Sequence, residues 1–306
     1  MKVKKIILLL TIMWMTPTLT MEVKMGLTPA CPTTEIPLDE LKILPLEMQT
    51  TILKLRYQNH PLKFFVLRKI PIPFMRLTEH TSLIYKLAFS PDSKILATGS
   101  ADSTAILWNT VTGAKIHTFT GHTNLIGTLA FSPNGKILAT GSGDKTLILW
   151  NTEAGAKIHT LRGHTDWINI LAFSPDGKIL ATGSIEKTAI LWDVATGAKI
   201  YTLTGHTGSI HTLAFSPDGK ILATGSTDKT AILWNTETGA KIRTLTDHTG
   251  LIHTLAFSPD GKILATGSND KTAILWNVAT GAKIHTLTEH TDWIKTLAFS
   301  PDGETL

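Results

Sequence analysis

The sequence predicts an all-β fold made of repeated four-stranded sheets, and three observations support this prediction. A His opens each copy of a 42-residue unit, and a Trp inside the unit keeps the same step. Each unit also contains short apolar runs separated by turn residues, with no helical pattern between them. The opening residues are His80, His122, His164, His206, His248 and His290, and the tryptophans are Trp108, Trp150, Trp192, Trp234 and Trp276. A fixed period of this size is typical of repeat architectures.

The copy at residues 206–247 shows how one unit divides into four strands. The first strand carries Ile210, Leu213 and Phe215, and the next three are Lys220 to Ser226, Thr230 to Asn235 and Lys241 to Thr246. The predicted turns are Pro217-Asp218-Gly219, Thr227-Asp228-Lys229 and Thr238-Gly239. In the first turn Pro fixes φ and Gly accepts a positive φ. Short strands joined in this way favour antiparallel hairpins.

The first strand of the unit contains an irregularity. The apolar residues Ile210, Leu213 and Phe215 are spaced by three and then by two. A regular strand alternates strictly and cannot place all three on one face. One extra residue restores the alternation, so we predict a β-bulge near His211.

The second strand is apolar on both faces, with Leu222 on one face and Ile221 and Ala223 on the other. A sheet with two apolar faces must be covered on both. Sheets stacked face to face around an axis cover one another. The sequence therefore predicts a β-propeller.

The repeated residues also resemble a known family, the tryptophan–aspartate (WD) repeats, over roughly residues 72–306. The resemblance rests on Gly121-His122, Gly163-His164 and Gly205-His206, each followed by a close copy of LAFSPDGKILATGS and by ILWN or ILWD. It implies a bonded series in each blade: the opening His, a Thr of strand two, an Asp of the next turn, and the Trp of strand three. The matching sets are His80, Thr98, Asp102, Trp108; His122, Thr140, Asp144, Trp150; His206, Thr224, Asp228, Trp234; and His248, Thr266, Asp270, Trp276.

Three departures from the family pattern are visible. The third repeat has Glu186 in place of Asp, and its longer side chain leaves open whether that network keeps its geometry. The Gly before the His is replaced in three copies, by Glu79, Asp247 and Glu289. The Asp after the Trp is Asn in every copy except at Asp193.

The repeats predict five complete four-stranded blades and an incomplete sixth. The sixth copy, His290 to Leu306, supplies a first strand and the start of a second. Ile72 to Thr78 is in phase with a fourth strand, and in the family an N-terminal strand commonly closes the ring. The ring is therefore expected to be open, to be completed by another chain, or to be truncated.

The first 43 residues predict export. Lys2, Lys4 and Lys5 precede the apolar run Ile6 to Met15, which is typical of a signal peptide and too short for a stable membrane span. Residues 1–20 are the predicted signal peptide, and the alternatives for this segment are an uncleaved anchor or a buried start. A cytoplasmic location is the alternative to export. Residues 21–43 are rich in Pro and Thr and are predicted to be a linker.

Residues 44–71 predict a short helical segment before the propeller. Leu44, Met48, Ile52 and Leu55 recur at spacings of three and four, which favours an amphipathic helix over residues 44–58. The following stretch, Leu62 to Ile70, fits a helix or a strand. This segment also resembles the start of an F-box, a module that pairs with WD propellers, over about a dozen residues that include Leu44-Pro45, Glu47, Ile52-Leu53 and Leu55.

The sequence contains no catalytic site. His, Thr and Asp suggest a hydrolase triad, but the set recurs in four repeats and is better explained as a buried polar network. His117, His159 and His285 lie in fourth strands of different blades and are interpreted as surface residues, not metal ligands. Cys31 is the single cysteine, and no phosphate-binding or HExxH motif occurs. We therefore predict no enzyme activity, no cofactor, no metal and no small-molecule substrate.

The net charge of +5 comes mostly from lysines scattered through the repeats, which does not indicate a nucleic-acid partner. The repeats differ mainly at one end of the blades, in the connections between strands four and one and the turns between strands two and three. We predict that this end binds a protein partner, as a non-enzymatic interaction scaffold. The alternative is an F-box/WD substrate receptor of a ubiquitin ligase, acting in a host cell if it is exported. The predicted binding residues are Asn124, Leu125, Asp166, Trp167, Asn169, Ile185, His211, His253, Asp292, Trp293 and Lys295.

Overall fold

The computed structural model describes residues 52–55, 63–66 and 77–306, and it divides the chain into two units, Met1–Phe74 and Met75–Leu306. In the first unit, β1 (Ile52–Leu55) pairs antiparallel with β2 (Lys63–Val66). The predicted signal, the linker and the rest of the F-box-like segment lie outside the described residues.

The helix predicted over residues 44–58 is wrong for Ile52–Leu55, which form a strand. The partner strand has the sequence KFFV, whose aromatic and β-branched residues favour a sheet. A short isolated helix is marginal in water, because few hydrogen bonds offset the cost of its first turn. Pairing with β2 gives the backbone of β1 hydrogen-bond partners that spacing along one segment does not reveal. The second apolar stretch, which the sequence left undecided, contains a strand.

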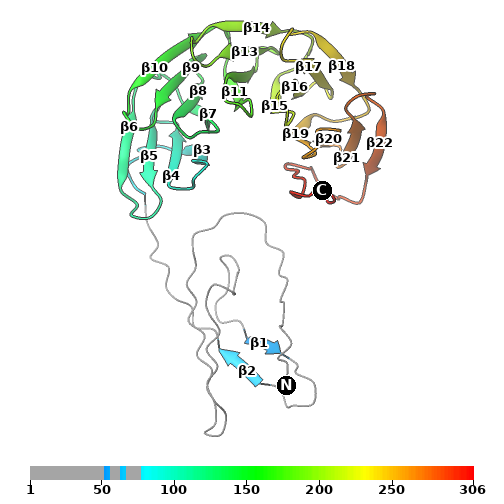
Figure 1. Ribbon diagram of the computed structural model, residues 1–306, viewed down its shortest axis with the longest axis horizontal. Coiled ribbons are helices and arrows are strands. Elements are labelled where there is room, and N and C mark those ends of the chain that lie inside the picture. Colours follow the sequence, from blue (N-terminus) through cyan, green and yellow to red (C-terminus); the bar gives the residue numbers. More distant parts are fainter. Residues whose placement is uncertain (1–51, 56–62, 67–76) are drawn as a thin grey trace. The chain divides into compact units, whose positions relative to one another are not determined.

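The second unit consists of five four-stranded antiparallel sheets, one for each complete repeat, and this confirms the predicted all-β propeller blades (Figure 1). The first strands are β3 (Ile84–Phe89), β7 (Ile126–Phe131), β11 (Ile168–Phe173), β15 (Ile210–Phe215) and β19 (Ile252–Phe257). The second strands are β4 (Ile95–Ser100), β8 (Ile137–Ser142), β12 (Ile179–Ser184), β16 (Ile221–Ser226) and β20 (Ile263–Ser268). The third strands are β5 (Ala105–Asn109), β9 (Thr146–Asn151), β13 (Ala189–Asp193), β17 (Ala231–Asn235) and β21 (Ala273–Asn277). The fourth strands are β6 (Lys115–Phe119), β10 (Lys157–Arg162), β14 (Lys199–Leu203), β18 (Lys241–Leu245) and β22 (Lys283–Leu287).

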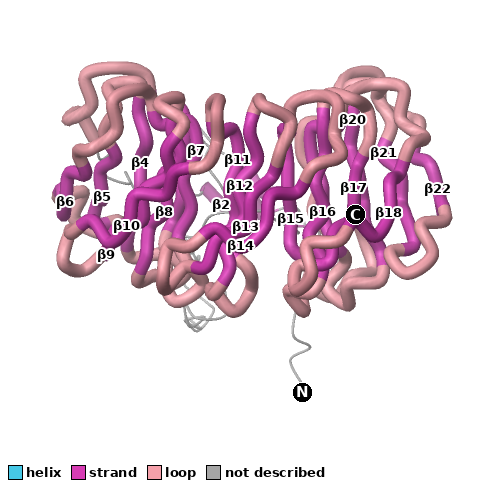
Figure 2. Tube along the Cα trace, turned by 90° about the horizontal axis from the view of Figure 1, so that it is seen from above, coloured by secondary structure: helices cyan, strands magenta, loops and turns pink. Residues whose placement is uncertain are grey.

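Within this unit the blades follow one another in chain order along an open arc. The first strands line the inside of the arc and the fourth strands line the outside (Figure 1). Neighbouring blades touch through their first strands, β3 with β7, β7 with β11, β11 with β15, and β15 with β19. The strands run between two ends of the unit, and the connecting loops lie at these ends (Figure 2). In the described part of the chain, no helix is long and apolar enough to cross a membrane.

Neighbouring blades pack by placing a large side chain of one blade over a small residue of the preceding blade. A Cβ added to Gly225 on β16 would lie 2.8 Å from Cγ2 of Ile252 on β19, so only Gly leaves room for this contact. Ile252 is 1% exposed, and Leu264 and Trp276 of the same blade share its apolar cluster with Ala223. The apolar faces deduced from the sequence are thus buried between neighbouring sheets.

Residues of the sixth copy occupy the corresponding place against the fifth blade. Ile294 is buried, and its Cγ2 lies 2.7 Å from the position of a Cβ on Gly267. The first turn of this copy is also formed, because the Gly303 amide donates to the Ser300 carbonyl at 2.9 Å. The first strand predicted for this copy is not formed, because no described residue after β22 belongs to a strand.

The predicted β-bulge is confirmed in all five first strands. In β15 the pairing with β16 shifts between Ile210 and Thr212, and His211 is the extra residue. The bulge brings Ile210 and Leu213 to the buried face and leaves the side chain of His211 exposed to solvent.

The turn between strands two and three has a residue with an unfavourable backbone conformation in every blade. Its third residue has φ between 66° and 77°, and it is Ser103 or one of four lysines. Lys229 has φ 73°. A residue with a Cβ pays about 1–2 kcal/mol in this left-handed region, whereas Gly does not. Replacing Lys229 by Gly is therefore expected to raise the free energy of unfolding by about 1 kcal/mol, measured by urea denaturation.

The control for this substitution is Lys220→Gly. Lys220 is outside the set of residues with positive φ, so Gly there relieves no strain and only adds freedom to the unfolded chain. It should lower stability. Equal effects of the two substitutions would contradict the assignment of strain to Lys229.

Outer-strand side chains connect each blade to the next. Nε2 of His117 lies 3.0 Å from the carbonyl oxygen of Glu153, and Nε2 of His159 lies 3.0 Å from that of Ala195. In the next two blades the donors at this place are Tyr201, at 2.7 Å from a carbonyl oxygen, and Arg243, at 2.8 Å. We call these four contacts the blade clamps. Two of the three histidines interpreted as surface residues, His117 and His159, therefore join neighbouring blades, whereas His285 is exposed.

Candidate binding surface

The end of the propeller predicted to bind a partner is built from two kinds of loop in each repeat. One loop connects strand four to the next strand one, and the other is the turn between strands two and three. A backbone hydrogen bond joins them in each blade, as from the Ile185 amide to the Trp167 carbonyl at 3.1 Å and from the Thr227 amide to the Ser209 carbonyl at 3.0 Å. We call this end, with both sets of loops, the variable end.

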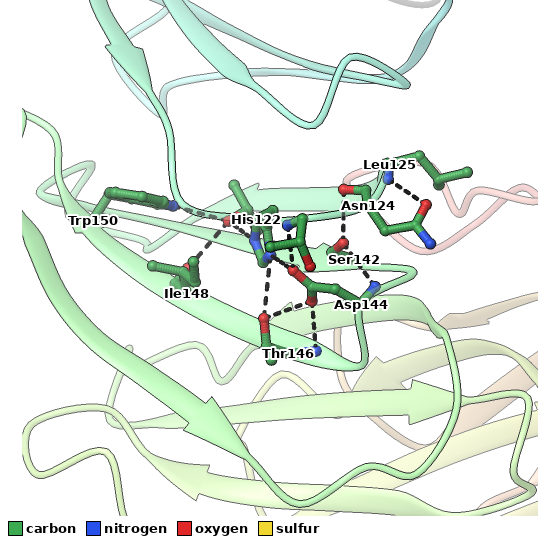
Figure 3. Close-up of polar contacts among 10 residues, drawn as sticks. His122, Asn124, Leu125, Ser142, Asp144, Thr146, Ile148 and Trp150 are labelled. Atoms are coloured by element: carbon green, nitrogen blue, oxygen red, sulfur yellow. Dashed lines mark hydrogen bonds and ion pairs between the residues drawn. The ribbon is translucent and has the colours of Figure 1, made fainter.

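A buried polar network holds the variable end in place, as shown for the second blade in Figure 3. Nδ1 of His122 lies 2.9 Å from Oδ2 of Asp144, and Nε2 of His122 lies 2.9 Å from the Thr140 hydroxyl. The same hydroxyl accepts a hydrogen bond from Nε1 of Trp150 at 2.9 Å. A carboxylate can only accept, so Nδ1 carries the proton and the Thr140 hydroxyl donates to Nε2. Burial lowers the pKa of His122, which keeps the imidazole neutral.

The network extends directly to the variable residues. The Ser142 hydroxyl donates to the Asn124 carbonyl at 2.9 Å and accepts from the Asp144 amide at 3.0 Å. The Asn124 side-chain oxygen in turn accepts from the Leu125 amide at 2.7 Å (Figure 3). The sequence of the rigid blade therefore fixes the backbone on which Asn124 and Leu125 are presented.

The third blade keeps its network although it has Glu186. Nδ1 of His164 lies 2.5 Å from Oε1 of Glu186, and the Thr188 hydroxyl donates to the same oxygen at 2.6 Å. The other oxygen accepts from the amide and the hydroxyl of Thr165. Burial alone would raise the pKa of Glu186, but hydrogen bonds from Thr165, Thr188 and His164 outweigh it and lower the pKa to about 2. The longer side chain therefore keeps the bonds to His164, Thr165 and Thr188, but it does not accept from the Thr188 amide as Asp144 does from the Thr146 amide.

These networks are structural. In the four repeats after the first, the Thr of the network is 0% exposed. Its hydroxyl donates a hydrogen bond to Nε2 of the neighbouring His. A nucleophile must reach a substrate, and these hydroxyls are covered by their own blades. Among the described residues, no group of three or more His, Cys, Asp or Glu is placed to hold a metal ion.

Trp167 and Trp293 stand at equivalent places in two loops of the variable end and remain 41% and 51% exposed. Each follows an Asp whose side chain accepts a hydrogen bond from the Trp amide, at 2.8 Å from Asp166 and 2.7 Å from Asp292. Trp167 leans over Gly143 of the preceding blade, with Cε2 3.3 Å from the position of a Cβ there. The rings are therefore held by contacts on one side and open to solvent on the other.

The bulge residues form a second part of the variable end, on the inside of the arc. They include Asn169 on β11, His211 on β15 and His253 on β19, and Lys295 stands at the equivalent place of the sixth copy. The ring of His253 stacks on Trp293, with centroids 5.7 Å apart and an angle of 27°. Asn169 donates to the carbonyl of Ile210 in the next blade at 3.4 Å. We call these four residues the inner row.

The structure thus arranges the predicted residues in two groups. Asn124 and Trp167 both contact the space above Gly143. His253 and Trp293 are stacked, next to His211 and Lys295 of the inner row. Ile185 lies between the groups, half-buried, and its carbonyl accepts from the Ser209 hydroxyl at 3.2 Å. The contacts place all these residues at one end, and whether they bind a partner stays a prediction.

Part of the sequence variation at this end keeps two facing loop residues from clashing: where one is large, the other is small. The sequence interpretation missed this relation. A Cβ on Gly208 would lie 2.7 Å from the Asp228 amide, and a Cβ on Gly250 would lie 2.7 Å from the Asp270 amide. Both glycines face the larger turn residues Thr227 and Asn269, whereas Asn124 faces Gly143. The sequence could have shown this relation, because the side chains at two positions 19 residues apart in a repeat differ in size in opposite directions.

Comparisons with known proteins agree with this architecture. A family model described as "Echinoderm microtubule-associated protein second beta-propeller" matches residues 84–248. A model described as "WD domain, G-beta repeat" matches residues 239–277 and 281–306. The protein Mut11 of Chlamydomonas reinhardtii is 48% identical over 42 residues, which are 14% of this chain and 11% of that protein.

Proposed function

Since the chain belongs to the WD-repeat β-propeller family, we propose that it is a protein-interaction scaffold whose partner binds across the variable end. The observation that supports this most is the pair of half-exposed tryptophans. An indole exposed to water is unfavourable, and Trp is among the commonest residues that anchor a protein interface. Two of them occupy equivalent loop places, Trp167 and Trp293, where other repeats have Leu or Ser.

The loops around these tryptophans are suited to this role because the blade fixes them. The polar network and the backbone bonds between loops order the surface before any partner arrives. A preordered surface loses less conformational entropy on binding than a flexible one. The shared network thus supplies the scaffold, and the variable positions supply the specificity.

The test is the double substitution Trp167→Ala with Trp293→Ala. A partner is first captured with the full chain and identified by mass spectrometry, and its affinity is then measured by calorimetry. We expect the double variant to bind at least about tenfold more weakly, because truncating an anchor typically costs about 2 kcal/mol or more. Thermal melting should change little, since both rings are half-exposed.

The matched control is Val111→Ala. Val111 is an apolar residue that is 81% exposed in a turn between strands three and four, at the opposite end of the blades. Its substitution should leave affinity unchanged. If the double variant melts at a lower temperature but keeps its affinity, the tryptophans belong to the scaffold and the proposed surface is wrong.

A further inference from the structure

The inner row brings three cationic or protonatable side chains together at equivalent places of neighbouring repeats. β15 contacts β19, and each strand places its bulge residue at the same level, so His211 and His253 are neighbours. Lys295 follows at the equivalent place in the sixth copy. His211 and Lys295 are exposed, and His253 is half-buried.

The charges of the row influence one another. The pKa of His211 is lowered by burial and by the charge of His253, and the pKa of His253 is lowered by burial and by the charge of Lys295. Like charges held close together are unfavourable unless an opposite charge joins them. The two imidazoles are therefore held in the neutral form in the free protein, and an anion at the row would favour their protonated form.

No carboxylate in the described part of the chain pairs with the row. The nearby acids are already engaged: Asp228 and Asp270 accept from the His and Thr of their own networks, and Asp292 accepts from the Trp293 amide. Among residues 77–306, no ion pair within 4.0 Å involves His211, His253 or Lys295. The turns beside them add the cations Lys229 and Lys271, not a free acid.

His253 also has an unmet hydrogen-bonding capacity. Its Nε2 is buried and has no hydrogen-bond partner among the described residues. Asn169, at the same place two blades earlier, does find a partner in the Ile210 carbonyl. A buried polar atom without a partner is unfavourable, and a turn of the side chain that brings Nε2 to the surface would let an acceptor satisfy it.

We propose that the inner row binds a carboxylate, presented by an Asp or Glu side chain of the partner beside Trp293. This inference rests on the proposed function, because it names the chemistry of the partner at the same surface. The carboxylate would accept hydrogen bonds from His211, His253 and Lys295, and apolar parts of the same segment would cover the exposed face of Trp293. Binding favours the protonated imidazoles, whose pKa values are lowered from 6.5 in the free protein, so affinity increases as pH falls through 6.5 and below.

The probe is a fluorescein-labelled hexaglutamate peptide, with hexaserine and hexalysine peptides of the same design beside it, and anisotropy as the measurement. The test variant is His211→Asn with His253→Asn and Lys295→Asn, since Asn169 shows that the strand accepts Asn at this place. The control is Lys178→Asn with Lys220→Asn and Lys262→Asn, three exposed lysines of the opposite end. We expect hexaglutamate alone to bind, about tenfold more weakly to the test variant and within about twofold of the wild type to the control.

Several outcomes overturn the proposal. They are no hexaglutamate binding to the wild type, equal losses in both variants, or binding that does not strengthen at lower pH. Binding of a phosphoserine peptide without binding of hexaglutamate assigns the row to phosphate and excludes the carboxylate. If a captured partner binds more weakly to the tryptophan variant but not to the inner-row variant, the proposed interaction surface stands and the carboxylate site is wrong. If neither variant changes the affinity, both the interaction surface and the carboxylate site are wrong.

Discussion

Replacing Trp234 by Ala is expected to lower the free energy of unfolding by about 3–5 kcal/mol, as for other large buried aromatic residues. Trp234 is 2% exposed, and its Nε1 donates to the Thr224 hydroxyl at 2.8 Å. Its ring also fills the space above Gly205, with Cη2 3.2 Å from the position of a Cβ there. Ala leaves a cavity and removes the donor at once. Urea denaturation at neutral pH measures the difference.

Trp234→Phe separates the two contributions. Phe fills much of the volume but cannot donate to Thr224, so we expect a smaller loss of about 1–2 kcal/mol. A loss below about 1 kcal/mol for Trp234→Ala would show that this residue does not belong to the core. Because each repeat contacts only its neighbours, the loss should appear first in the fourth blade, detectable by amide hydrogen exchange.

Replacing Asp270 by Ala is expected to cost about 2–4 kcal/mol, because it leaves several donors without an acceptor. One carboxylate oxygen accepts from Nδ1 of His248 at 2.8 Å and from the Thr249 amide at 2.9 Å. The other accepts from the amide of Thr272 at 2.9 Å and from its hydroxyl at 2.6 Å. Asp270→Glu is the matched control, because Glu186 forms the same kind of network in the third blade. Glu should retain most of the stability.

The contribution of Asp270 also depends on pH. Burial alone would raise its pKa, but hydrogen bonds from Thr272, His248 and Thr249 outweigh it and lower the pKa to about 2. The unfolded chain titrates near about 3.9, so the stabilisation is present above that pH and is lost as pH falls toward 2. The stability difference between wild type and Asp270→Ala should therefore shrink between about pH 5 and pH 2. A constant difference would contradict the role of the ionised carboxylate.

The sequence predicted the blades well because every feature of the strands is local and repeated. The bulge at His211 followed from a spacing that no regular strand satisfies, and the structure has it in all five blades. The polar network followed from the family resemblance, and it is present in each of the five blades, around the Trp of the third strand. Five near-copies of one signal leave little room for another fold.

The features that were missed depend on contacts between segments far apart in the sequence. β1 forms because it pairs with β2. The spacing of apolar residues within Leu44 to Gln58 contains no information about that partner strand. The room that Gly143 gives Trp167 depends on the neighbouring blade. Glu186 keeps its network because the Thr165 loop meets the longer side chain, which the residue type alone did not decide. The position of each candidate residue at the variable end was predictable, but its exposure and its neighbours were not.

The blade clamps have a consequence for how such a chain evolves. Each clamp joins a side-chain donor to a main-chain carbonyl, and four positions use His, His, Tyr and Arg for the same purpose. A carbonyl is the same in every repeat, whatever the residue that carries it. A recombination event that adds or removes one 42-residue unit can therefore keep the clamp at the new junction without a compensating substitution. The gene can change its number of blades in a single step and leave the loops of the variable end free to diverge afterwards.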